Sequence, residues 1–213
     1  MAFGWELKSY EFLEADILST IAVKKISDKK GQKQMNQGRF FVKIALLGEG
    51  GVGKSTLLKA FTDQKLNNGY EMTLGIDFAI KKINVDSQKI VLSLWDFGGQ
   101  KQFWSIAETF LTGTMGIAYV YDVANPLSLF ELNKWIEKAR EFFSLKGQKS
   151  PYELLVGTKI DFENKIDEET LRDFMDQFSL KEHLLCSSVL KHNVEEPFMK
   201  LLDMIVKGRK DAC

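Results

Sequence analysis

The sequence has little cysteine, no long apolar run and no excess of either charge, and each shortage excludes a class of protein. Cys186 and Cys213 are the only cysteines in 213 residues, too few for a disulfide framework, so we expect a reducing, cytoplasmic environment. No apolar stretch reaches the length of about 18 residues that a membrane span needs. Basic and acidic residues number 29 each, which gives no electrostatic reason to expect a nucleic-acid partner.

Signals for export and for lipid attachment are missing as well. The N-terminus lacks the basic start and apolar stretch of a secretory signal. Ala2 stands where myristoylation requires glycine, and Cys213 is the last residue, whereas a prenylation box needs its cysteine further from the end. The sequence therefore leaves open whether Cys213 is modified and whether the protein associates with membranes.

The first 39 residues differ in pattern from the rest of the chain. Apolar residues recur there at spacings of three and four, which predicts one apolar helix face: Leu7, Tyr10, Leu13, Ile17 and Ile21. The opposite face carries Glu6, Lys8, Glu11, Glu14 and Asp16. Residues 24–38 are polar and predict a linker or an exposed loop. The apolar face can pack on the following domain, bind a partner or touch a membrane, although an acidic polar face disfavours the membrane.

From Arg39 onward, predicted strands and helices alternate. Apolar runs predict strands over residues 40–47, 76–85, 89–96, 116–122, 152–158 and 183–187, with a turn at Asp86 and Ser87. Helices are expected over residues 55–64, 127–143, 168–178 and 193–206. The alternation predicts an α/β fold with a mostly parallel six-stranded sheet and helices on both faces. We expect an N-terminal extension over residues 1–39, one domain over 40–207 and a short tail over 208–213.

A glycine-rich motif lies between the first predicted strand and the first predicted helix. Residues 48–55 read Gly-Glu-Gly-Gly-Val-Gly-Lys-Ser and fit the Walker A pattern at every required position. Glycines let backbone N–H groups approach phosphate oxygens, and the helix start adds further N–H groups and a positive dipole end. Lys54 supplies charge for the outer phosphates. Nucleotide contacts are therefore predicted for Glu49, Gly50, Gly51, Val52, Gly53, Lys54, Ser55 and Thr56.

A second motif, Asp96-Phe97-Gly98-Gly99-Gln100, follows an apolar strand. Asp96 can hold a water bound to Mg²⁺, the Gly99 N–H can meet the γ-phosphate, and Gln100 can orient an attacking water. In the loop between the two motifs, the Thr73 hydroxyl can complete the Mg²⁺ shell and Tyr70 can close over the phosphates. The predicted metal ligands are Ser55, Thr73 and, through water, Asp96, and the predicted catalytic residues are Lys54, Thr73 and Gln100.

Two further segments favour guanine as the base. Thr158-Lys159-Ile160-Asp161 ends a buried strand, and the Asp161 carboxylate can accept from the two guanine N–H donors that adenine lacks. The Lys159 stem can lie along the base plane. Ser187, Ser188 and Val189 follow the last predicted strand, where a backbone N–H near Ser188 can donate to the guanine oxygen. Thr158 and these three residues complete the predicted nucleotide contacts.

The order and spacing of these motifs resemble the Ras superfamily of small GTPases over about residues 40–207. All five nucleotide-binding motifs of that family have a counterpart: residues 48–55, Thr73, 96–100, 158–161 and 187–188. The resemblance implies the P-loop fold known as the G domain, switching between GTP and GDP, and a requirement for Mg²⁺. It also implies an exchange factor, a GTPase-activating protein and effectors as partners, and we expect a monomer.

Features of more than one subfamily are present. The segment Thr73-Leu74-Gly75-Ile76-Asp77-Phe78 is similar to the effector segment of Rab proteins, as is Asn193-Val194-Glu195-Glu196. Phe97-Gly98-Gly99-Gln100 is similar to Arf and septation-type GTPases instead. Thr158 departs from the Asn that usually begins the fourth motif and is similar to some Rho-family and septation-type members, whereas Asp161 retains the preference for guanine. A role in membrane traffic or intracellular signalling is the function that this resemblance implies.

Arginine is scarce, with only Arg39, Arg140, Arg172 and Arg209 in the chain, and none lies between Leu66 and Thr73. Some GTPases supply a catalytic arginine from that segment. We therefore expect slow intrinsic hydrolysis that an activating protein accelerates. Two alternatives remain: a scaffold that holds GTP with negligible turnover, and an ATPase or kinase of the P-loop class, which Asp161 disfavours.

Overall fold

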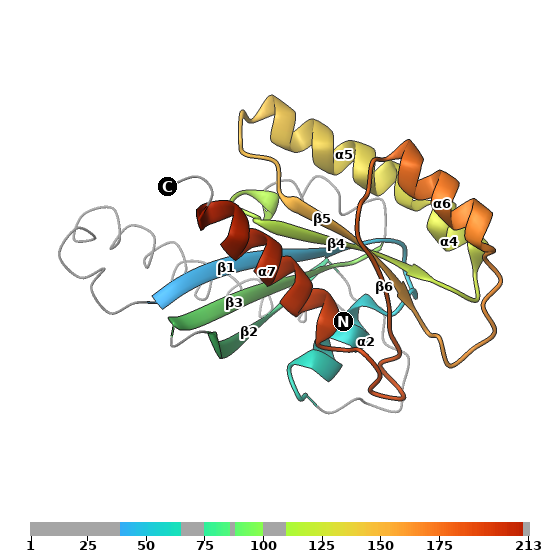
Figure 1. Cartoon of the computed structure of the whole chain (residues 1–213), viewed down its shortest axis with the longest axis horizontal. Helices are drawn as coiled ribbons and strands as arrows, with labels where there is room; N and C mark the ends of the chain where they lie inside the picture. Colours follow the sequence, from blue (N-terminus) through green and yellow to red (C-terminus); the bar gives the residue numbers. More distant parts are fainter. Residues whose placement is uncertain (1–38, 65–74, 86–87, 100–109, 211–213) are drawn as a thin grey trace, which may run out of the picture.

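The computed structural model describes residues 39–64, 75–85, 88–99 and 110–210 of the chain. The described strands are β1 (Arg39–Leu47), β2 (Ile76–Val85), β3 (Gln88–Phe97), β4 (Gly116–Asp122), β5 (Tyr152–Thr158) and β6 (His183–Leu185). The described helices are α2 (Lys54–Phe61), α4 (Pro126–Phe130), α5 (Leu132–Leu145), α6 (Glu168–Gln177) and α7 (Glu196–Lys210). Figure 1 shows the strands side by side in one twisted sheet with helices packed on it.

The sheet has the order β2-β3-β1-β4-β5-β6. Its only antiparallel pair among the described strands is β2 with β3, whereas β3, β1, β4, β5 and β6 pair in parallel. β4 is buried along its whole length, as expected for a central parallel strand that is covered on both faces. The prediction of a mostly parallel six-stranded sheet is therefore confirmed.

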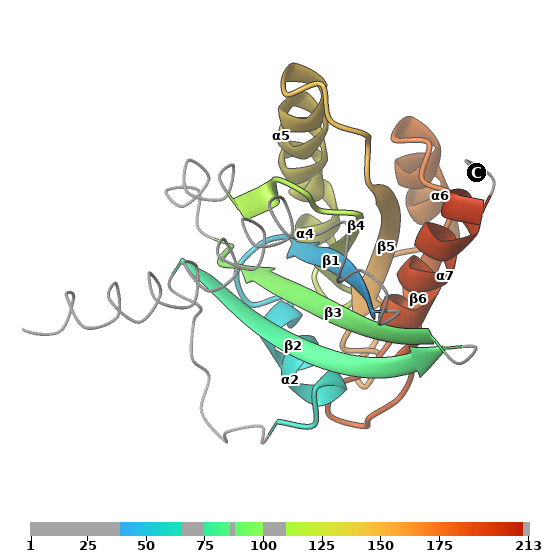
Figure 2. The same cartoon turned by 90° about the vertical axis from the view of Figure 1, so that its left-hand side faces the viewer.

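The helices divide between the two faces of the sheet and enclose a core on each. On one face α2 and α7 cover a core in which the rings of Phe61 and Phe198 stack with centroids 4.1 Å apart. On the other face α4, α5 and α6 cover a core that includes Tyr119, Trp135 and Phe174. Figure 2 shows α7 and α5 on opposite sides of the sheet. This is the arrangement with helices on both faces that the alternating pattern predicts.

Several element boundaries differ from the predictions. The helix expected over residues 127–143 is divided at Glu131 into α4 and α5, although the Glu131 N–H still bonds to the Leu127 carbonyl at 2.9 Å. The helix expected from residue 193 begins at Glu196, because Asn193 has a left-handed φ of 53° that a helix cannot contain. Left-handed Asp63, with φ of 58°, likewise follows the end of α2 at Phe61, short of the predicted residue 64.

The strand expected over residues 183–187 ends at Leu185 in the structure. Ser187 instead forms an isolated antiparallel bridge with His192, which turns the chain away from the sheet. Residues 1–38 and the turn at Asp86 and Ser87 lie outside the described residues. Within the described part, none of the helices has the length and apolar composition needed to cross a bilayer.

Candidate functional site

The predicted site segments leave the sheet at a single edge. Because β1, β3, β4, β5 and β6 run in parallel, their carboxyl ends meet there, and ligands of open α/β sheets bind outside these ends. Residues 48–53 follow β1, Gly98 and Gly99 follow β3, residues 159–161 follow β5, and residues 187–189 follow β6. The strand order therefore brings together four segments that are far apart in the sequence.

Two glycines allow the close packing of the loop after β1. Gly48 has φ of +148°, and a Cβ atom there would lie 2.2 Å from the carbonyl oxygen of Val120. A Cβ atom at Gly99 would lie 1.9 Å from the backbone nitrogen of Gly50. Only glycine fits either position, since real Cβ atoms do not approach backbone so closely. The segment after β3 therefore lies directly against the loop between β1 and α2.

Lys54 is a buried cation at the start of α2. Its side chain is 5% exposed, and its Nζ donates to the carbonyl oxygens of Gly48 at 2.8 Å and Glu49 at 2.7 Å. Burial lowers the pKa of Lys54 to about 8, against the opposing effect of the negative charges on Asp96 and Glu49. An ammonium held by loop carbonyls in a dry environment is an electrostatic partner for an anion that binds within the same loop.

The Ser55 hydroxyl donates to the Oδ2 atom of Asp96 across the space between α2 and the end of β3. Asp96 is fully buried, and Ser55 stands one residue after Lys54 in the first turn of the helix. A hydroxyl and a carboxylate are hard oxygen donors of the kind that Mg²⁺ prefers. In the described residues there is no group of three His, Cys, Asp or Glu side chains that could hold a metal by itself. This donor set suits a Mg²⁺ ion that takes its other ligands from phosphate and water.

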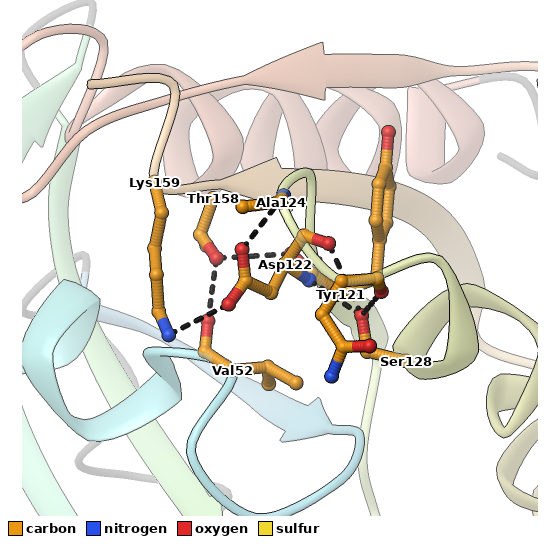
Figure 3. A network of polar contacts seen from close by, with 8 residues as sticks. Val52, Tyr121, Asp122, Ala124, Ser128, Thr158 and Lys159 are labelled. Atoms are coloured by element: carbon orange, nitrogen blue, oxygen red, sulfur yellow. Dashed lines mark hydrogen bonds and ion pairs between the residues drawn. The ribbon is translucent and has the colours of Figure 1, made fainter. Parts of the chain in front are cut away.

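Thr158, at the end of β5, links the phosphate loop to the sheet. Its hydroxyl contacts the carbonyl oxygen of Val52 and also that of Tyr121, the latter at 2.9 Å (Figure 3). The side chain is 2% exposed, so the hydroxyl exchanges no hydrogen bonds with bulk water. Thr158 therefore fixes the loop after β1 against two other strands of the sheet.

An ion pair lies beside Thr158 and joins the ends of β4 and β5. Lys159 Nζ lies 2.7 Å from Asp122 Oδ2, and the Oδ1 atom of the same carboxylate accepts from the Ala124 N–H at 2.9 Å (Figure 3). The Asp122 N–H in turn donates to the Ser128 hydroxyl at 2.9 Å. Lys159 has a left-handed φ of 63°, a strained backbone for a residue with a side chain. The pair fixes the Lys159 side chain, whose Cε atom lies beside Gly53 of the loop after β1.

The carboxylate of Asp161 is oriented by a residue of another predicted motif. Ser187 Oγ donates to Asp161 Oδ1 at 2.5 Å and accepts from the Leu190 N–H at 3.1 Å. Asp161 itself is exposed, whereas Ser187 is fully buried and Ser188 is 7% exposed. The structure thus presents a positioned carboxylate to solvent at the end of β5, with the backbone after β6 beside it.

The structure places the remaining predicted residues as follows. Glu49, Gly50, Gly51, Val52 and Gly53 form the loop between β1 and α2, and Thr56 lies in the first turn of α2. Val189 is 71% exposed. Tyr70, Thr73 and Gln100 lie outside the described residues, so the nucleotide contact predicted for Tyr70 and the metal and catalytic roles predicted for Thr73 and Gln100 stay predictions.

Two contacts in the site involve residues that the sequence reasoning did not single out. Asp122 pairs with Lys159. Because Asp122 is a carboxylate at the end of a buried apolar strand, the sequence pattern could have indicated it as a site residue. Trp135 of α5 donates from Nε1 to Glu49 Oε1 at 3.2 Å. No local pattern indicates this second contact, because it depends on how α5 packs against the sheet.

Comparison with known proteins identifies the family. The model of the Ras family matches residues 43–207. A Dictyostelium discoideum protein, Ras-related protein Rab-8B, is 35% identical over 175 residues, which cover 81% of this chain and 84% of that protein. Ras-family proteins are GTPases that bind GTP and GDP, as the resemblance of the five motifs implies. The chain therefore belongs to the Ras family of small GTPases.

Proposed function

We propose that this chain is a GTP-hydrolysing molecular switch whose nucleotide lies along the carboxyl edge of the sheet. The observation that carries the proposal is the arrangement of two contrasting groups on that edge. Lys54, Ser55 and Asp96 meet at the ends of β1 and β3, whereas Asp161 and Ser187 meet at the ends of β5 and β6. The first group suits a triphosphate with Mg²⁺, and the second suits a base that carries N–H donors.

At the phosphate end, Lys54 and the N–H groups of residues 49–56 bind the phosphates. Ser55 and Thr73 would hold Mg²⁺ directly, and Asp96 would hold it through water. Bound Mg²⁺ supplies charge that offsets the β- and γ-phosphates. The contact of Ser55 with Asp96 supports this assignment, because it places both oxygen donors beside Lys54.

At the base end, Asp161 accepts from the two guanine donors and Ser187 keeps the carboxylate in orientation. Lys159, held by Asp122, lies along the base, and the backbone at Ser188 and Val189 donates to the guanine oxygen. Thr158 takes the position that is usually Asn and acts on the phosphate loop through Val52. We infer that this hydroxyl fixes the loop rather than touching the base.

In the proposed catalytic step, Gln100 orients the attacking water while Thr73 and Gly99 meet the γ-phosphate. Loss of that phosphate releases both loops, and effectors bind only the ordered form. The missing arginine before Thr73 predicts slow intrinsic hydrolysis and a GTPase-activating protein as partner. An exchange factor and effectors complete the cycle. The resemblance to Rab proteins supports a cytoplasmic monomer that acts in membrane traffic or intracellular signalling.

Hydrolysis by the full chain tests the proposal against a GTP-holding scaffold. Single-turnover phosphate release from bound GTP should be slow and measurable, and Gln100→Leu should slow it by about tenfold or more. Gln177→Leu, a change at an exposed glutamine of α6, is the matched control and should leave the rate unchanged. Equal rates for Gln100→Leu and the original chain would favour the scaffold, and displacement of GTP by equimolar ATP would contradict guanine selection.

A further inference from the structure

One part of the sheet exposes apolar side chains among the described residues. Alternate residues of a strand share a face. Ala45 and Trp95 belong to the core that includes residues of α4 and α5, and Phe78 is partly buried against that core. Residues paired across the three strands form rows on this face. Two rows further along the strands, Val91 of β3 lies between its two partners, Phe41 of β1 and Lys82 of β2. The row between them contains Lys43, Ser93 and Ile80. The face therefore continues from the core onto Phe41, Val91 and Ile80, which we name the β1–β2 patch.

Two of the three residues of the β1–β2 patch are exposed, and Val91 between them is half-buried. Phe41 and Ile80 are each 57% exposed, whereas Val42 and Ile44, which point to the opposite face of β1, are fully buried. In Figure 2, β2, β3 and β1 lie together on the side of the sheet away from β5 and β6. Large aromatic and branched side chains that share one face and remain in water mark an interaction surface.

The rim of the patch is basic. Lys82 is opposite Val91, and Lys89 follows one row further, opposite Asn84 and Arg39. Both lysines are exposed, and within the described residues neither forms a salt bridge. A partner that fits this surface therefore combines an apolar stripe with acidic flanks.

We propose that the segment before β1, residues 1–38 of the same chain, docks on the β1–β2 patch. Its apolar residues from Leu7 to Ile21 recur at helical spacing, and its polar face is rich in acidic residues, notably Glu11 and Glu14. Three strands are about 10 Å across, which matches the diameter of one helix. The apolar stripe and acidic residues of this segment, and the width of a single helix, thus match the β1–β2 patch and its basic rim.

The covalent connection favours this occupant over a separate partner. The segment enters the described structure at Arg39, two residues before Phe41 of the patch. Residues 22–38 can span up to about 55 Å when extended, so a helix formed by the preceding residues can fold back onto β1. A tether of this kind gives an effective concentration on the order of millimolar. The basic rim would also attract an anionic membrane, but such a surface would repel the acidic face of the segment tethered beside the patch.

Hydrogen–deuterium exchange on the full chain tests the proposal. Amides of residues 7–21 should exchange about tenfold or more slowly than those of an isolated peptide of residues 1–24. The double variant Phe41→Ser/Ile80→Ser should return them to the peptide rate. Leu127→Ser/Leu145→Ser removes two leucines of α4 and α5 that are even more exposed than Phe41 and Ile80, and it should preserve the protection. Unchanged exchange in α7 establishes that each variant is folded.

Several results would overturn the proposal. Exchange of residues 7–21 at the peptide rate in the original chain would show that nothing covers them. Protection that survives Phe41→Ser/Ile80→Ser would place the segment elsewhere. Protection that grows with protein concentration would indicate a second copy, and protection that appears only with phosphatidylserine vesicles would indicate a membrane. Each of these outcomes is independent of GTP hydrolysis, so the inference and the proposed function can fail separately.

Discussion

At the scale of single residues, Thr158 supplies a tertiary hydrogen bond that the site depends on. Thr158→Val keeps the shape but leaves the carbonyls of Val52 and Tyr121 without this donor, so the free energy of unfolding should fall by about 1–3 kcal/mol. Urea denaturation measures the change. GDP should also dissociate faster, because the phosphate loop is less firmly held.

Thr114 provides the matched control for this substitution. It is 4% exposed, and its hydroxyl has no hydrogen-bond partner among the residues that the structure describes. Thr114→Val should therefore leave the free energy of unfolding nearly unchanged or raise it, because it removes an unsatisfied buried hydroxyl. Equal losses for the two variants would show that the Thr158 hydrogen bonds contribute nothing specific.

The ionisation of Lys54 predicts a pH dependence of nucleotide binding. The pKa of Lys54 is lowered to about 8 by burial, and phosphate oxygens favour the charged form. Binding then requires proton uptake above that pKa, so the dissociation constant for GDP should rise about fourfold between about pH 7 and about pH 8.5. Fluorescence titration measures it. Lys54→Met should bind GDP more weakly at every pH and lose this dependence.

The same lowering of the Lys54 pKa has the opposite effect on the stability of the nucleotide-free chain, which should increase as the pH rises. The unfolded chain, with the ordinary lysine pKa of 10.5, holds more protons than the folded chain between pH 8 and 10.5. The cost of burying charged Lys54 is therefore fully present below about pH 8 and is relieved as the pH rises. As the pH rises, GDP affinity should fall while the Lys54 contribution to stability improves, and Lys54→Met should remove both of these contributions.

At the scale of elements, α6 has a well-defined cap at its start. Asp167 accepts from the Thr170 N–H at 2.7 Å and from the Thr170 hydroxyl at 3.0 Å, and these hydrogen bonds lower the pKa of the carboxyl group. The stabilisation is present above the ordinary pKa of 3.8 and is lost as the pH falls through the lowered value. Asp167→Ala should lower the midpoint of thermal unfolding at neutral pH. Asp167→Asn should retain most of the cap and lose its acid sensitivity.

At the scale of the whole molecule, nucleotide binding and folding should be linked, because the site is assembled from four strands. GDP at about 100 times its dissociation constant should raise the free energy of unfolding by about 3 kcal/mol, and equal ATP should not. Asp161→Ala should abolish most of the shift at the same GDP concentration, while Asp173→Ala, at an exposed position of α6, should retain it. A shift with ATP equal to that with GDP would contradict the assigned base.

The sequence determined those features that are written in short contiguous segments. Residues 48–55 and 96–99 were recognisable because a phosphate loop needs glycines, a lysine and a hydroxyl at fixed spacing. The sheet was predictable because buried parallel strands such as β4 and β5 are continuous apolar runs. These features rest on local chemistry, which neighbours along the chain specify.

Only the tertiary structure decided which distant residues meet. Ser55 and Asp96 are 41 residues apart, Thr158 and Val52 are 106 apart, and Asp161 and Ser187 are 26 apart. Strand order and register bring these pairs together, and no local pattern encodes either. For the same reason, apolar Phe41 could not be distinguished in the sequence from buried Val42. Exposure depends on whether a helix covers that face of the sheet, and α4, α5 and α6 leave Phe41 in solvent.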